Sequence, residues 1–283
     1  MKQAKINLIL SMLIFGSIGL FRRMLPFYSG QIAFVRGAIG AVVLLLWGVI
    51  GTQKIEWSHL KKNAKLLIFS GIAIGINWIL LFESYRFTTV SNATICYYFA
   101  PVIVMILSPV VLKERLRGRK VLCILVAMVG LCMVASPNEH NIGTNDTLGI
   151  LLGLGAAVFY ACVILLNKRF TDISGVERTF VQLGVAALSI LPYTLLMEPL
   201  SWMQVSLVKD GTLLLIVGVI HTAIAYLLYF SSMKKLNAQT IATFSYVDPI
   251  SAIVLAAIFL QELPNVLQII GGMFVLGATF FAL

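Results

Sequence analysis

Residues 97–101 have the sequence YYFAP, and residues 245–249, 148 positions later, have the sequence SYVDP. In the same register Glu114 aligns with Glu262, and a leucine precedes each glutamate by two positions. Similarity at one fixed offset is typical of a chain built from repeated units, with chance similarity between apolar stretches as the alternative. The offset predicts two related halves, each with a proline near the middle of an apolar run.

Apolar residues surround these segments throughout the chain of 283 residues, of which 60% are apolar and 11% are charged. Soluble domains have about 45–50% apolar and about 25% charged residues. This composition therefore excludes a soluble enzyme, a disordered chain and a disulfide scaffold. Ten spans of roughly 20 residues would use about 200 residues, which leaves short connections and no separate soluble domain.

The apolar runs predict ten transmembrane helices with soft boundaries. These lie at residues 6–25, 30–51, 64–84, 90–112, 121–136, 147–167, 178–197, 211–232, 239–260 and 265–283. Five spans per half is an odd number, so the second half must enter the membrane from the opposite side. We therefore expect an all-α membrane protein with ten transmembrane helices in two inverted five-helix repeats, residues 1–140 and 141–283. Inverted repeats are typical of transporters that bind substrate near the midplane of the membrane.

The net charge of +10 is explained by the positions of the basic residues. If the N-terminus is cytoplasmic, 16 of the 21 Lys and Arg residues fall on the cytoplasmic side of the predicted topology, as the positive-inside rule requires. We therefore expect a multi-pass protein of the cell membrane with both termini in the cytoplasm and no nucleic-acid partner. The basic residues 113–120 are interpreted as a cytoplasmic loop, with anionic-lipid binding as the alternative.

The sequence motifs predict no metal site, no cofactor and no enzymatic activity. The four cysteines lie in apolar spans without the spacing of metal ligands. Phosphate-binding loops and protease motifs are absent from the sequence, which argues against an ATP-driven pump and an intramembrane protease. The expected partners are the lipid bilayer and a small-molecule substrate, and the chain is expected to act as a monomer or a homodimer.

Charged residues at membrane depth are the strongest functional signals, because each is costly unless it is paired or hydrated. Arg36, Glu83, Arg86 and Asp248 are the four candidates. Glu83 and Arg86 are three residues apart on a predicted helix, so an interfacial salt bridge is the alternative to substrate binding. Arg36 and Asp248 are each either substrate ligands or polar braces between helices. Glu114 and Glu262 are interpreted as structural helix-end contacts.

Aromatic and polar side chains on the predicted helices complete the candidate site. The substrate-binding candidates are Arg36, Trp78, Glu83, Tyr85, Thr94, Tyr97, Tyr98, Tyr229, Tyr246 and Asp248. The candidates for coupling to protons are Glu83, His221 and Asp248, although a lone histidine in a helix is more often a packing residue. Pro101 and Pro249 each free a backbone carbonyl four residues earlier, which predicts either paired helix discontinuities at the site or ordinary kinks.

These motifs resemble those of the drug/metabolite transporter superfamily, EamA type. The resemblance is carried by FG at 15–16, FVR at 34–36, FAP at 99–101 with LKERL at 112–116, YVDP at 246–249, LQEL at 260–263 and GG at 271–272. It implies a ten-helix carrier built from inverted repeats. Members export amino acids, amines, purines and drugs, and some import, so the resemblance leaves the substrate open. Residues 77–83, NWILLFE, depart from the commoner small, apolar pattern and could mark a substrate subgroup.

The leading hypothesis is a secondary transporter that works by alternating access and exports an amino acid or related amine. Arg36 would bind the substrate carboxylate, and Glu83 or Asp248 would bind the amine or a proton. One rival is an importer of a cation such as a quaternary ammonium compound, favoured by the aromatic and acidic side chains. Others are a lipid flippase or a non-transporting membrane adaptor. An intramembrane enzyme has no support in the sequence.

Overall fold

The computed structural model describes residues 2–50, 55–88, 93, 96–115, 117–134, 146–199, 206, 208–260 and 266–281, and this part of the chain contains helices and no strand. The first half contains α1 (Lys2–Met24), α2 (Ser29–Ile50), α3 (Trp57–Phe87), α5 (Ala100–Leu112) and α6 (Gly118–Val134). The second half contains α7 (Asp146–Asn167), α8 (Gly175–Met197), α9 (Lys209–Gly218), the π-helix η2 (Val219–Ile224), α10 (Ala225–Met233), α11 (Ala238–Phe244), α12 (Val247–Leu260) and α13 (Val266–Phe281).

Six helical runs are long and apolar enough to cross a membrane, within the described residues. They are most of α1, then α2, α3, most of α7, α8, and the continuous run of α9, η2 and α10; α5 is apolar but shorter. This confirms, for the part of the chain that the structure describes, an all-helical fold with helices long enough to span a membrane. The full set of ten spans stays a prediction.

Several predicted spans differ from the helices of the structure, and the one at 90–112 is interrupted by a turn at residues 98–99. The expected single helix at 239–260 is two helices, because α11 ends at Phe244 and α12 begins at Val247. The expected span at 64–84 is longer, because α3 begins at Trp57. Polar contacts hold this early turn: Asn63 Nδ2 donates to the Thr171 carbonyl at 2.9 Å. Hydropathy alone did not predict the extension, since its residues are polar.

A second polar contact joins the same turn of α3 to the connection between α7 and α8. Lys62 Nζ donates to Asp172 Oδ2 at 2.7 Å, and this hydrogen bond lowers the pKa of the Asp172 carboxyl. In the connection between α5 and α6, the Glu114 carboxylate accepts a hydrogen bond from the N–H of Ala238 at 2.9 Å. Ala238 is the first residue of α11. Such a carboxylate also complements the positive end of the helix dipole. Glu262, its counterpart in the repeat, lies outside the described residues.

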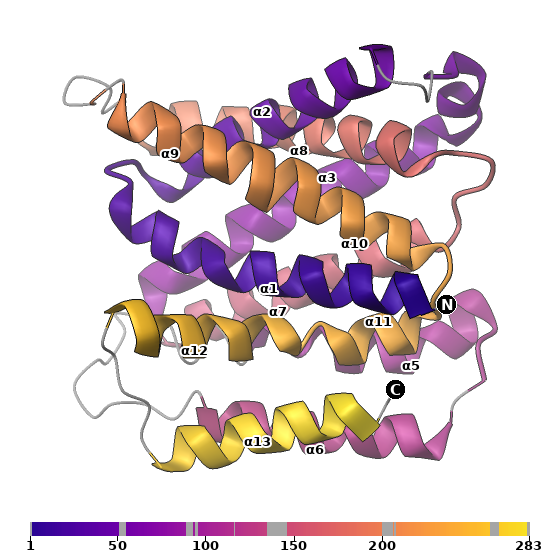
Figure 1. Cartoon of the computed structure of the whole chain (residues 1–283), viewed down its shortest axis with the longest axis vertical. Helices are drawn as coiled ribbons and strands as arrows, with labels where there is room; N and C mark the ends of the chain where they lie inside the picture. The colour runs from indigo at the N-terminus through magenta and orange to yellow at the C-terminus, as the bar shows by residue number, and fades with distance from the viewer. Residues whose placement is uncertain are drawn as a thin grey trace.

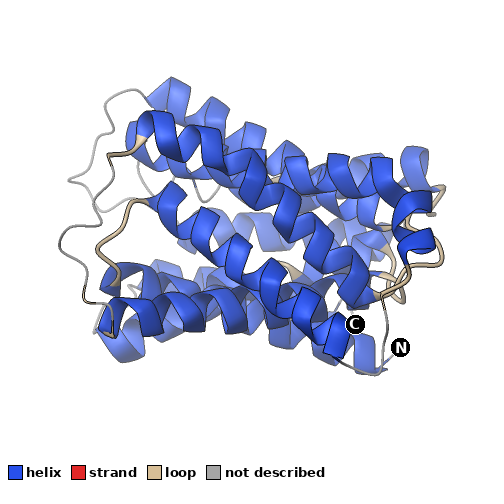
Figure 2. Cartoon of the chain, turned by 90° about the horizontal axis from the view of Figure 1, so that it is seen from above, coloured by secondary structure: helices blue, strands red, loops and turns tan. Residues whose placement is uncertain are grey.

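The most extensive helix contacts join a helix of the first half of the chain to a helix of the second half. In the first half α1 packs against α10 and α12, and α7, the first helix of the second half, packs correspondingly against α3 and α5. Three further pairs join corresponding helices of the two halves, α2 on α8, α5 on α11, and α6 on α13, and α3 also packs against α8. Figure 1 shows α1 beginning and α13 ending at the same end of the bundle, and Figure 2 shows the helices from above.

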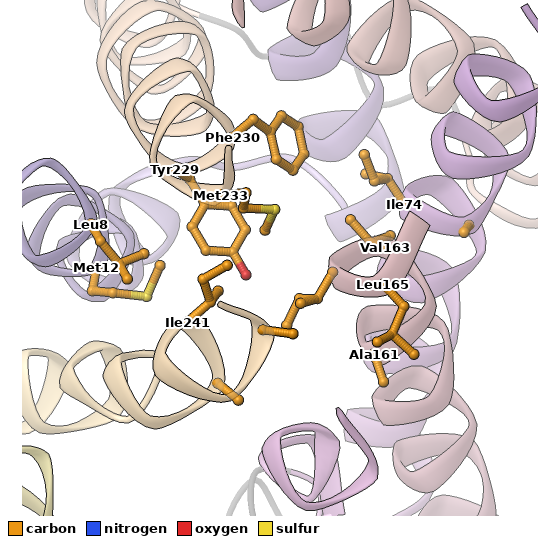
Figure 3. Close-up of a cluster of buried hydrophobic side chains, with 14 of the residues drawn as sticks. Leu8, Met12, Ile74, Ala161, Val163, Leu165, Tyr229, Phe230, Met233 and Ile241 are labelled. Carbon is orange, nitrogen blue, oxygen red and sulfur yellow. The ribbon is translucent and has the colours of Figure 1, made fainter. Parts of the chain in front are cut away.

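The largest apolar core joins both halves of the chain. In Figure 3, Leu8 and Met12 of α1 lie on one side of Tyr229, while the labelled side chains of α7 lie on the other. Lipid is as apolar as these side chains, so close packing rather than exclusion of water holds such helices together. The core therefore depends on how closely the helix backbones approach.

One close approach lies between α3 and α8. A Cβ atom added to Gly75 would lie 1.9 Å from Ser189 Oγ and 3.0 Å from the Ala186 carbonyl oxygen. We expect Gly75→Val to destabilise the protein by about 1–3 kcal/mol through overpacking, measured as a lower thermal unfolding midpoint in detergent. The matched control is Gly19→Val, because nothing lies within 4 Å of a Cβ at Gly19. Equal midpoints for the two variants would contradict this packing argument.

Candidate functional site

Arg36 of α2 lies inside the helix bundle with its guanidinium over the ring of Trp78 of α3. The guanidinium carbon is 4.0 Å from the ring centroid. Arg36 is only 9% exposed, and its buried Nε has no hydrogen-bond partner. It makes no ion pair with any acidic residue in the described part of the chain. The cation–π contact is therefore a partial compensation, and the charge remains available to an anionic group.

Tyr226 of α10 completes this corner of the site, and the sequence analysis missed it. The Trp78 indole N–H donates to the Tyr226 hydroxyl at 3.1 Å. Phe15 of α1 packs its ring edge-on against Tyr226, with centroids 4.9 Å apart. Trp78 and Tyr226 are 148 residues apart, which is the offset of the repeat. The signal was present in the sequence, because the shift that aligns the prolines also aligns these two aromatic residues.

Three tyrosines form the adjoining wall. Tyr97 stacks on Tyr160 of α7, with centroids 5.3 Å apart and an interplanar angle of 8°. The Tyr160 hydroxyl shares a hydrogen bond with the Tyr229 hydroxyl at 2.9 Å and another with Ser245 Oγ at 3.2 Å. Tyr160 was not among the sequence candidates, since no repeat match or charge distinguishes it. It joins α7 to Tyr229 of α10 and to the break between α11 and α12.

The two helix interruptions lie beside each other. Residues 98–99 and 245–246 are turns between helical segments, and the Tyr246 hydroxyl donates to the Tyr98 carbonyl at 3.3 Å. Pro101 is in the first turn of α5, and Pro249 is in the first turn of α12. Pro249 has no N–H to bind the Ser245 carbonyl, and this carbonyl instead accepts the N–H of Asp248 at 3.3 Å. The helix is therefore interrupted at residues 245–246, just before the proline.

Asp248 is in the first turn of α12, and its carboxylate accepts a hydrogen bond from the Tyr98 hydroxyl. Its carboxylate is within electrostatic range of Tyr97 and Tyr226, and Arg36 is within range of the same two phenols. No ion pair joins Asp248 to Arg36. We name the set Arg36, Trp78, Tyr97, Tyr226 and Asp248 the central cluster. It places one cation and one acid within electrostatic range of the same two tyrosines.

Glu83 lies apart from the central cluster. Its carboxylate accepts a hydrogen bond from Arg86 at 2.9 Å and another from the Tyr193 hydroxyl of α8. The salt bridge that the sequence offered as an alternative is thus present at the end of α3. Tyr85, two residues on, is within electrostatic range of Tyr97. Tyr85 therefore lies within range of the central cluster, whereas the Glu83 carboxylate is hydrogen-bonded outside it.

His221 lies in the π-helix η2, a feature that the sequence analysis did not predict. Its Nε2 is 2.9 Å from Ser17 Oγ of α1, and its ring centroid is 4.6 Å from that of Phe21. His221 is 2% exposed and within electrostatic range of Arg36. Single π-helical turns inside helices are frequent at functional sites. Thr94, the remaining sequence candidate, lies outside the described residues.

Comparisons with known proteins agree with this architecture. The model of the EamA-like transporter family matches residues 3–136 and again residues 147–283. The chain is 31% identical to "Uncharacterized transporter YxxF" of Bacillus subtilis, over 95% of this chain and 85% of that protein. It is 25% identical to "Protein RarD" of Salmonella typhimurium, over 74% and 71% of the two chains. A solved crystal structure, 18% identical, covers 99% of this chain and 96% of its own with a TM-score of 0.85, which shows a shared fold.

Proposed function

Because this chain belongs to the EamA-like transporter family, we propose that it is a secondary transporter that exports a small zwitterionic metabolite, an amino acid or related amine. Membership supports an integral membrane transporter rather than an enzyme. The substrate class, the direction and the coupling are our inferences. We further propose a location in the cell membrane with both termini in the cytoplasm, from the distribution of basic residues.

The observation that carries the substrate class is the pair of opposite charges in the central cluster. Arg36 and Asp248 flank the same tyrosines without an ion pair between them. A zwitterion satisfies both, with its carboxylate at Arg36 and its ammonium group at Asp248. Desolvated charges are costly unless they are compensated, so a ligand with both charges is favoured over one with a single charge.

The position of Arg36 argues against the rival import of a quaternary ammonium compound. Such a ligand needs the open face of an aromatic ring. The Arg36 guanidinium already lies 4.0 Å from the centroid of Trp78, and a second cation there would meet like-charge repulsion. The Asp248 carboxylate, which accepts a hydrogen bond from the Tyr98 hydroxyl, supports an amine group within the ligand, and Arg36 supports an additional anionic group.

Alternating access between two inverted repeats is supported by the contacts that cross between the halves. Trp78 with Tyr226, and Tyr98 with Tyr246, are pairs of residues at the repeat offset that touch each other. Equivalent residues meet when they lie close to the axis that relates two repeats, so the central cluster lies where the halves meet. A ligand bound there is exposed to one side or the other when one half rocks against its partner.

Reconstitution into liposomes tests the substrate class. We expect proteoliposomes loaded with an unlabelled amino acid to accumulate labelled amino acid by exchange, at a rate well above that of empty liposomes. The screen includes neutral, acidic and basic amino acids, simple amines, nucleobases and a fluorescent phospholipid. Exchange of nucleobases alone, or scrambling of the phospholipid alone, would overturn the proposal. Everted membrane vesicles, in which export becomes uptake, test the direction.

A further inference from the structure

Helices α6 and α13 form a pair at the edge of the bundle, shown together in Figure 1. Between them lies a groove of about 360 Å³, and none of its lining residues belongs to the central cluster. Its walls are apolar, with Leu122 and Val126 on α6 and Phe274 and Phe281 on α13, and Arg119 lines it as well. A groove of this kind offers an apolar channel with one cationic group.

The backbones of the two helices approach each other closely at Gly130. A Cβ atom at Gly130 would lie 2.5 Å from the Gly271 carbonyl oxygen, so the backbones meet there. At Gly277, nearer the other end of α13, nothing lies within 4 Å of such an atom. Gly277 lines the groove, and its missing side chain therefore leaves the floor of the groove open.

The length of the groove matches one leaflet of a bilayer. The lining covers residues 119–126 of α6 and 273–281 of α13, which is about 10–12 Å at about 1.5 Å per residue. One leaflet contributes about 15 Å of hydrocarbon. The arrangement fits an extended acyl chain in the leaflet nearest Arg119.

Charge favours an anionic lipid over a second copy of this chain. Arg119 is exposed and makes no ion pair with any described acidic residue, and Lys113, Arg115 and Arg117 precede it. The nearby Glu114 is engaged with the N–H of Ala238. A two-fold interface on this face would bring the same basic segment of two chains together, whereas a lipid phosphate would complement it.

We propose that the groove between α6 and α13 binds one acyl chain of an anionic phospholipid whose phosphate is held by Arg119. The occupant is a lipid of the leaflet that contains the basic residues 113–119. This site is separate from the central cluster and does not depend on the identity of the transported substrate.

Native mass spectrometry of the full chain tests the site. The detergent-solubilised protein is titrated with phosphatidylglycerol or with phosphatidylcholine that has the same acyl chains. We expect preferential retention of phosphatidylglycerol, and an approximately fivefold loss of that retention in Arg119→Gln, the effect of one basic residue at a membrane surface. Gly277→Leu, which fills the groove, is expected to lower the retention of both lipids.

Two matched variants serve as controls. Arg117→Gln removes an exposed charge outside the groove lining, and Gly19→Leu adds a side chain to open space on α1; both are expected to retain lipid as the unmodified chain does. Equal retention of the two lipids by the unmodified chain would overturn the proposal. Unchanged retention in Arg119→Gln would do so as well. A dimer that dissociates in Gly277→Leu would show that a second copy occupies the groove instead.

Discussion

Arg36→Gln is expected to reduce transport of the zwitterionic substrate by about 30-fold or more. Gln removes the cationic group opposite the substrate carboxylate and leaves that carboxylate desolvated without a partner. Truncation of one member of a buried, hydrogen-bonded charge pair costs about 2–5 kcal/mol, and about 2 kcal/mol corresponds to about 30-fold in affinity. The measurement is initial exchange rate against substrate concentration in proteoliposomes.

Two further variants separate recognition by Arg36 from a structural role. Arg36→Lys keeps the charge but loses the planar group that stacks at 4.0 Å on Trp78, so an intermediate rate is expected. Arg22→Gln, at the exposed end of α1, is expected to transport normally. Thermal unfolding is measured for each variant. Normal exchange in Arg36→Gln would identify Arg36 as a polar brace between helices, the alternative that the sequence left open.

The sequence was sufficient to find the charged residues of the central cluster and one pair of residues beside it that match across the repeat. Arg36 and Asp248 stand out because charge is rare in apolar spans. Tyr98 and Tyr246 stand out because they align at the offset of 148 residues, and the structure places them in contact. Trp78 aligns with Tyr226 by the same rule, so a complete search at that offset would have found Tyr226 as well.

Other contacts could not be predicted, because they depend on how each helix is rotated. Helices that are apolar on every side show no preferred face in the sequence, so nothing indicated that Tyr160 of α7 faces Tyr97. Glu83 accepts a hydrogen bond from Tyr193, 110 residues away, and no local pattern predicts this contact. The π-helix that contains His221 adds a residue to one turn, which changes the side-chain register without a sequence signature.

Asp248→Asn is expected to have the second large effect, a loss of both substrate exchange and proton coupling. Asn has nearly the same shape as Asp but no negative charge. It can therefore neither neutralise the ammonium group of the substrate nor bind and release a proton. We expect the exchange rate of the zwitterion to fall by about 30-fold or more, for the same reason as at Arg36. An imposed pH gradient, which is expected to accelerate uptake by the unmodified protein, should have no effect on the variant.

The other candidates for proton coupling provide the comparison. Glu83→Gln is expected to keep the response to the pH gradient, because its carboxylate is engaged by Arg86 and Tyr193 outside the central cluster. His221→Gln tests the group that contacts Ser17 Oγ at 2.9 Å. A pH response that persists in Asp248→Asn but is lost in His221→Gln would assign the proton coupling to His221 in the π-helix. Persistence in all three variants would exclude every candidate.

Substrate analogues distinguish direct binding by Asp248 and Arg36 from a shared structural role. An analogue without the amino group has no need of Asp248, so Asp248→Asn is expected to bind it as well as the unmodified protein does. An analogue with an amidated carboxylate has no need of Arg36, and Arg36→Gln is expected to bind it normally. Each variant should therefore lose only the ligands whose charge it can no longer match. Equal losses for every ligand in both variants would mean that the two charges hold the helices together, because a misfolded cluster cannot discriminate between analogues.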